Sequence, residues 1–127
     1  MTAFAAEQWQ RAVTTLETAK RIADDDPDSA ASRSFYAAFH AVTALFAAEG
    51  KDFKKHSAFR AAVHRDLVNT GRWPSDLGVA YDFLMEMRET GDYGGLARVT
   101  AEDAKSAIDF AQRILDVVAP GFLNQKG

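Results

Sequence analysis

Residues 30–49 read AASRSFYAAFHAVTALFAAE, and the organisation of the rest of the chain follows from this stretch. Between Phe35 and Ala48 the only polar groups are the tips of Tyr36, His40 and Thr43. A helix that is apolar on nearly every side belongs in the interior of a protein, and its alanines let neighbouring helices approach closely. We therefore expect 30–49 to be a buried central helix, capped by Ser29 and stopped by Gly50.

Helical spacing of apolar residues extends to the segments on both sides of this helix. It predicts further helices over residues 2–23, 58–70, 76–89 and 101–118. The breaks between them are expected at the Asp-rich stretch 24–28, the polar loop 50–55, the stretch 71–74 and the glycine-bearing loop 90–99, with 120–121 closing the last helix. Thr100 with Asp103 resembles a capping box. No segment alternates with the period of a strand, so we expect an all-α fold, a compact five-helix bundle forming one domain over 1–127.

Composition narrows the classes of protein to which the chain can belong. It has 127 residues, of which 47% are hydrophobic and none is cysteine, and its formal net charge is −3. These values exclude an intrinsically disordered chain, a disulfide framework and thiolate chemistry. No signal peptide or membrane-spanning run is evident, so we expect no membrane association and a cytoplasmic location.

The central helix carries the first candidate site. Arg33 and His40 lie seven residues apart, two helical turns, and so share nearly the same face with Tyr36 between them. Such a group can bind a phosphate and move a proton. The alternative is structural, because a histidine in an alanine-rich helix is often a hydrogen-bonded core residue and a first-turn arginine is often solvated.

A second candidate is the basic segment 51–72, which has six Lys or Arg residues against two Asp on a chain that is acidic overall. We expect it to meet an anion or an acidic partner; the alternative is a solvated loop with a capping serine. The candidate RNA- or nucleotide-binding residues are Tyr36, Lys54, Lys55, His56, Ser57 and Arg60. No histidine stands at a recognised metal-ligand spacing and no cofactor fingerprint occurs, so we expect neither a metal nor a cofactor.

Three motifs resemble those of small prokaryotic HEPN-domain proteins. Residues 32–41, SRSFYAAFHA, are similar to the helix motif SRxYYAxFHA of that family. Lys55-His56-Ser57 resembles its THSG turn, and residues 88–94 resemble its RxxADYG loop. The resemblance implies a helical bundle that forms a homodimer. It also implies a nucleotidyltransferase partner in a toxin–antitoxin pair. In active members it implies metal-independent ribonuclease activity from an Arg and a His with four to six residues between them.

The catalytic residues that the resemblance implies are distributed unusually. The stretch Arg88–Tyr93 matches the usual position of the family's motif but holds Asp92 and Tyr93 and no histidine, whereas Arg33 and His40 meet the spacing on another helix. The candidates for catalysis are Arg33, His40, Arg88 and Tyr93, and Tyr93 also matches the tyrosine that partner enzymes nucleotidylate. We expect binding of RNA or nucleotide, with or without RNA cleavage; the alternative is a non-catalytic, antitoxin-like interaction module. From the residues alone, a structural use of Arg88, which can pair with Asp92 and fix the loop, is favoured over a functional one.

Overall fold

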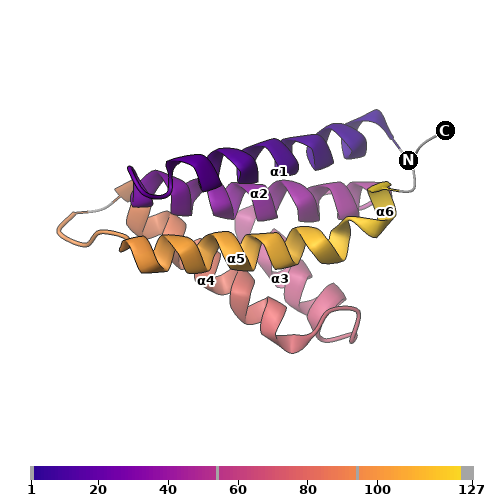
Figure 1. Ribbon diagram of the computed structural model, residues 1–127. Coiled ribbons are helices and arrows are strands. Elements are labelled where there is room, and N and C mark those ends of the chain that lie inside the picture. Colours follow the sequence, from indigo (N-terminus) through magenta and orange to yellow (C-terminus); the bar gives the residue numbers. More distant parts are fainter. Residues whose placement is uncertain (1, 54, 94, 124–127) are drawn as a thin grey trace.

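A computed structural model describes residues 2–53, 55–93 and 95–123, and within these ranges the chain is helical with no strand. Helices α1 (Ala3–Ile22), α2 (Pro27–Ala48) and α5 (Ala101–Val118) run alongside one another, and α4 (Ser75–Tyr93) crosses them obliquely (Figure 1). Helix α3 (His56–Ala62) continues directly into the π-helical segment η1 (Val63–Val68), and the short α6 (Pro120–Leu123) follows α5. The predicted all-α bundle is confirmed, with α6 as an addition to the five expected helices.

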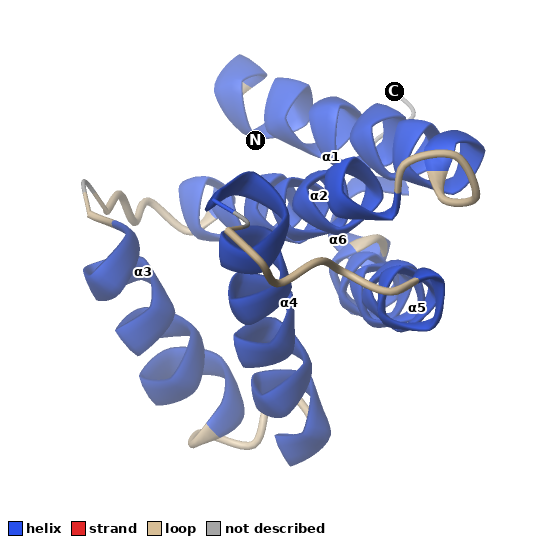
Figure 2. Ribbon diagram, turned by 90° about the vertical axis from the view of Figure 1, so that its left-hand side faces the viewer, coloured by secondary structure: helices blue, strands red, loops and turns tan. Residues whose placement is uncertain are grey.

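Helix α2 is the centre of the bundle, as its composition predicts. It packs against α1, α4 and α5, and Figure 2 shows it between α1 and α4. Close packing of α1 on α2 depends on small side chains, because alanines keep two helix backbones near each other. The buried alanines of α1 recur every seven residues: Ala5, Ala12 and Ala19. Helix α2 has six buried alanines: Ala30, Ala31, Ala37, Ala38, Ala41 and Ala44.

The start of α2 differs from the prediction. The helix begins at Pro27, and its cap is Asp26, whose Oδ1 accepts a hydrogen bond from the Ser29 backbone N–H at 3.1 Å. The prediction of Ser29 as the cap is therefore wrong. A proline suits the first helical position because its missing N–H has no intrahelical partner there, so Pro27 opens α2 and does not serve to end α1.

The end of α4 also differs, in a way that matters for the site. The predicted loop 90–99 is wrong over its first residues, because α4 extends through Gly91 and Asp92 to Tyr93. A β-carbon at Gly91 would lie 2.5 Å from the backbone oxygen of Asp28, so only glycine permits this approach of α4 to α2. The carboxylate of Asp28 accepts a hydrogen bond from the Val99 N–H at 2.9 Å and so holds the following loop against α2.

The remaining boundaries follow the predicted pattern with smaller shifts. The third predicted helix, 58–70, begins earlier, at His56, and changes to π-helical geometry at Val63. The fifth, 101–118, is observed with those bounds, and Thr100 caps it by accepting the Asp103 N–H at 3.0 Å. No helix within the described ranges is both long and apolar enough to cross a bilayer.

Candidate functional site

Arg88 lies in the last turns of α4 and is pressed against α2. Its Nη1 donates a hydrogen bond to the hydroxyl of Tyr36 at 3.3 Å. The guanidinium carbon stands 5.2 Å from the ring centre of Phe35 and 5.8 Å from that of Tyr36, within cation–π range of both. Only 14% of the side chain is exposed. The fold therefore holds a cation in a mostly apolar setting between two helices.

The hydrogen-bonding groups of Arg88 are incompletely satisfied by its neighbours. Burial by itself lowers the pKa of Arg88, but the contacts with Tyr36 and Tyr93 outweigh it, so the net pKa is raised and the group stays cationic. Asp92 forms an ion pair with Arg88 whose oxygen lies 3.6 Å from Nη1, so the carboxylate offsets the charge without accepting a hydrogen bond. The Nε of Arg88 is buried without a hydrogen-bond partner among the described residues. A buried donor with no partner is uncommon in folded proteins and attracts an anion.

A cavity of about 270 Å³ is lined by Tyr36 and Asp92, the two residues that bind the Arg88 guanidinium, and we call it the Arg33 cavity. Its lining consists of Ser29, Ser32, Arg33, Tyr36 and Asp92. Tyr36 and Asp92 also contact Arg88, so a second cation besides Arg33 lies behind these two lining residues. Arg33 is exposed and forms no ion pair within the described part of the chain. Two cations with two serine hydroxyls, near the start of a helix, are a setting suited to a phosphate.

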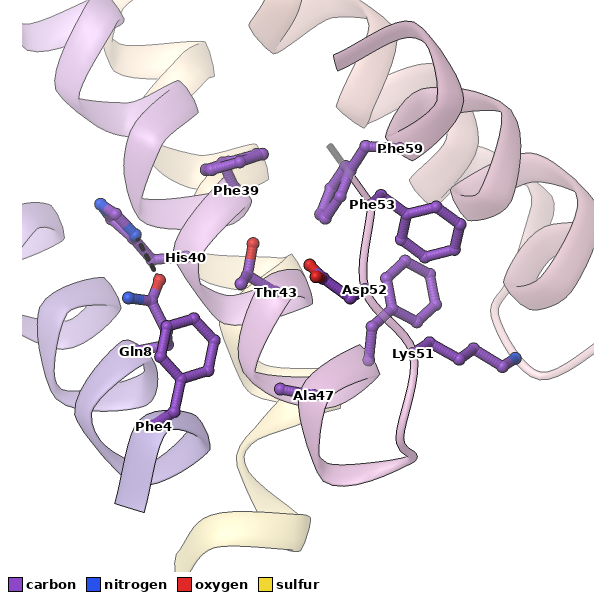
Figure 3. A pocket seen from close by; sticks show the side chains of 11 residues that line it. Phe4, Gln8, Phe39, His40, Thr43, Ala47, Lys51, Asp52, Phe53 and Phe59 are labelled. Carbon is purple, nitrogen blue, oxygen red and sulfur yellow. Dashed lines mark hydrogen bonds between the residues drawn. The ribbon is translucent and has the colours of Figure 1, made fainter. Parts of the chain in front are cut away.

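His40 faces a different cavity, of about 310 Å³, which we call the His40 cavity. Figure 3 shows it between α1, α2 and the loop that follows α2. The side chains around it are mostly aromatic: Phe4, Phe39, Phe46, Phe53 and Phe59 line it, together with Gln8, His40, Thr43, Ala47, Lys51 and Asp52.

The imidazole of His40 is held in one orientation. Its Nδ1 lies 2.8 Å from Oε1 of Gln8, and an amide oxygen can only accept, so Nδ1 donates and Nε2 keeps a lone pair. Burial, and to a smaller degree the charge of Arg11, lowers the pKa of His40 below its ordinary value of 6.5. The ring is therefore neutral at neutral pH and is able to accept a proton.

The structure brings some of the predicted site residues together and separates others. Arg33 and Tyr36 line one cavity with Arg88 behind it, and Tyr93, which is 75% exposed, lies on the last turn of the same α4. His40 lines the other cavity. The roles predicted for these residues in catalysis and binding stay predictions. Ser29 and Ser32 were not among the predicted site residues, although Ser29 lies four residues before Arg33 and Ser32 four residues before Tyr36, about one helical turn.

Most of the basic side chains in the segment 51–72 form ion pairs and are not available to an external anion by themselves. Four of its six cations pair with carboxylates, at distances of 2.6–3.6 Å: Lys51 and Arg65 with Asp66, Arg60 with Asp82, and Arg72 with Glu49. The hydrogen bond from Arg65 is the main cause that lowers the pKa of Asp66 to about 2. Asp82 and Glu49 come from outside the segment, so the local charge excess is partly neutralised in the fold.

The remaining predicted binding residues lie around the start of α3. Lys55 and Ser57 are exposed there. Lys54 and the side chain of His56 lie outside the described residues. Among those that are described, no three metal-ligating side chains form a cluster.

Comparison with known proteins agrees with the architecture. A model of the HEPN domain matches residues 5–121. The chain is 40% identical over 114 residues to a UPF0332 protein of Thermotoga maritima, a match that covers 88% of this chain and 86% of that protein. It is 30% identical over 127 residues to a UPF0332 protein of Gloeobacter violaceus, covering 98% of this chain and all of that one. Together with the buried α2 and the motifs it carries, these matches show that the chain belongs to the HEPN-domain family.

Proposed function

We propose that this HEPN-domain protein binds RNA or a nucleotide by its phosphate, in the Arg33 cavity, and that it works as a homodimer with a nucleotidyltransferase partner in a toxin–antitoxin pair. The observation that carries the binding proposal is the buried, incompletely satisfied Arg88 behind a cavity lined by a second, unpaired arginine. Family membership supports the remaining parts.

The chemistry of phosphate binding follows from the positions of these groups. The guanidinium of Arg33 and the hydroxyls of Ser29 and Ser32 are available to donate to phosphate oxygens. The Tyr36 oxygen accepts from Arg88, so its own O–H proton is free to donate as well. Arg88 adds positive potential from a site of low exposure, where salt screens it less than it screens a surface charge.

Binding is tested by fluorescence anisotropy with a labelled single-stranded RNA, and with a labelled adenosine nucleotide as the second arm. The variant Arg33→Gln removes the exposed cation without disturbing a buried group. We expect weaker RNA binding and a slope of log affinity against log salt that is smaller by about 0.7, the value for one phosphate contact on a single strand.

The control is Arg21→Gln, which removes an exposed arginine from α1, where it contacts only Thr18 among the described residues. This variant should bind RNA with nearly the wild-type salt slope. Equal losses in both variants would mean that net charge, not the Arg33 cavity, holds the RNA. Binding of the nucleotide but not of RNA would restrict the proposal to nucleotides, and binding of neither would refute it.

Cleavage is measured in the same samples. RNA is incubated with the wild-type protein in chelator, beside His40→Ala and Arg88→Ala. Loss of cleavage in both variants would support ribonuclease activity. The same background in all three would leave binding as the function of the site. His40 lines the His40 cavity, and Arg88 contacts the wall of the Arg33 cavity. The two variants therefore test separately whether each cavity is needed for cleavage.

The dimer proposal rests on exposed apolar side chains next to α4. Leu96 is fully exposed and Tyr93 is 75% exposed, and burying these side chains against a second copy would be favourable. We expect a dimer by light scattering after size exclusion, and a monomer for Leu96→Asp. A wild-type monomer would contradict the proposal. A tagged chain should also retain a co-expressed nucleotidyltransferase, and failure to do so would remove that partner.

A further inference from the structure

The His40 cavity is an aromatic pocket built from separate parts of the chain. Phe39 and Phe59 have ring centres 4.7 Å apart, and Phe46 and Phe53 have centres 5.2 Å apart. They come from α2, from the loop after it and from α3. Figure 3 shows Phe53 and Phe59 on one side of the opening and Phe4 on the other. Its volume of about 310 Å³ is that of a small-molecule site, and its walls suit a flat ring.

Two polar groups within this aromatic lining have no use in the fold itself. The hydroxyl of Thr43 is buried and has no hydrogen-bond partner among the described residues. Asp52 lines the same cavity, is exposed, and forms no ion pair within the described part of the chain. A buried hydroxyl without a partner is costly, and an ionised carboxylate at the exposed rim of the cavity accepts hydrogen bonds only. The pocket therefore offers acceptors to a ligand that carries N–H donors.

The charges around the cavity favour a neutral ligand. Lys51 lies 5.7 Å from the ring centre of Phe46, with its Nζ 3.6 Å from Asp66. Its charge and that of Asp52 offset each other at the rim, and His40 is neutral at neutral pH. Lys51 would repel a cationic ligand at the same aromatic wall, and Asp52 would repel an anionic one.

We propose that the His40 cavity binds a nucleobase, with guanine preferred because its adjacent ring and amino N–H groups can both donate to the Asp52 carboxylate. This inference rests on the proposed function, and it assigns a base site to complement the phosphate site. Tyr36 and Thr43 lie on one face of α2, seven residues or about 10 Å apart along its axis, so one strand of RNA can reach both cavities. Aromatic rings around a base are the usual way in which proteins hold unpaired nucleotides.

The test uses guanosine, which has no phosphate, so that the Arg33 cavity does not contribute. Isothermal titration calorimetry is run with guanosine, adenosine and tetramethylammonium chloride on the wild-type protein, Asp52→Asn and Thr43→Val. The matched control is Asp25→Asn, which neutralises an exposed carboxylate after α1. We expect guanosine to bind about tenfold more tightly than adenosine, and Asp52→Asn to lose that preference. Thr43→Val should weaken both nucleosides while the protein stays folded, because valine has nearly the same shape.

Each result has a defined meaning. Equal guanosine binding by wild type, Asp52→Asn and Thr43→Val would overturn the base site, as would binding of tetramethylammonium in place of the nucleosides. RNA binding that depends on Arg33 but is unchanged by Asp52→Asn would overturn the base site and leave the phosphate site standing. Guanosine binding without any binding of RNA or of the adenosine nucleotide would support the base site and refute the proposed function.

Discussion

Replacing Gly91 by alanine should force the end of α4 away from the start of α2. The added β-carbon would lie 2.5 Å from the backbone oxygen of Asp28 and 3.2 Å from its carbonyl carbon. Carbon–oxygen contacts of this kind normally begin at about 3.3 Å, so the two backbones must separate by about 0.8 Å. Neither atom belongs to a side chain that can rotate aside. Arg88 and Asp92 lie within one turn of Gly91 and would move with it.

The expected cost comes from two opposing effects. Overpacking in a well-packed contact costs about 1–3 kcal/mol, and the rigid backbone neighbour of Gly91 places this contact in the upper part of that range. Alanine returns about 1 kcal/mol of helix propensity relative to glycine. We therefore expect the free energy of unfolding to fall by about 1–2 kcal/mol, with a melting temperature lower by roughly 3–8 °C.

The assay is thermal and urea unfolding followed by circular dichroism, with RNA anisotropy on the same samples. The control is Gly121→Ala, where a β-carbon meets nothing within 4 Å and the stability should stay the same or rise slightly. We expect Gly91→Ala to bind RNA more weakly as well, because the Arg33 cavity is built across this contact. A Gly91→Ala protein as stable as the wild type would refute the close approach of α4 to α2.

Three other predictions follow from the same contacts. Asp92→Asn should raise RNA affinity about twofold to fivefold in the anisotropy assay, because it removes a negative charge from the cavity; weaker binding would show that Asp92 serves mainly to position Arg88. The pKa of His40 is lowered on folding, so the unfolded chain binds its proton more tightly and stability falls as the pH drops below 6.5. Urea titrations between about pH 7.5 and about pH 5 should show a smaller fall in His40→Gln than in wild type, and parallel curves would contradict this. Thr100→Ala should lower the free energy of unfolding, measured with urea, by about 1 kcal/mol because α5 loses its cap. The control Thr14→Ala, at an exposed position in the middle of α1, should change it little.

The helices were predictable because their apolar periodicity is local. The bounds of α5 agree with the prediction because Thr100 caps its first turn and Pro120 follows its last residues. The start of α2 was misassigned because both Asp26 and Ser29 are good caps, and only the three-dimensional path of the chain selects between them. The length of α4 was underestimated because glycine ordinarily disfavours a helix, whereas Gly91 is retained for its contact with α2.

The candidate site was predictable only in part. The spacing of Arg33, Tyr36 and His40 correctly places them along α2, but it does not say which neighbours cover that helix. Helix α4 brings Arg88 to Tyr36, whereas α1 and the loop after α2 enclose His40. The charge excess of 51–72 was overestimated, because its partners Glu49 and Asp82 lie outside the segment.

Local patterns in the chain alone are sufficient for the all-α class and the buried central helix, since each depends on residues within a few turns of one another. The resemblance to the family needed three short motifs in order along the chain, and each of them is again local. Tertiary structure decided which cations are paired, which are left with unsatisfied donors, and which cavity each side chain faces. These properties depend on contacts between residues far apart in sequence, such as Arg88 with Tyr36 and Gly91 with Asp28. The hydrogen bonding and the pKa of a polar side chain depend on such neighbours, and helical periodicity carries no information about them.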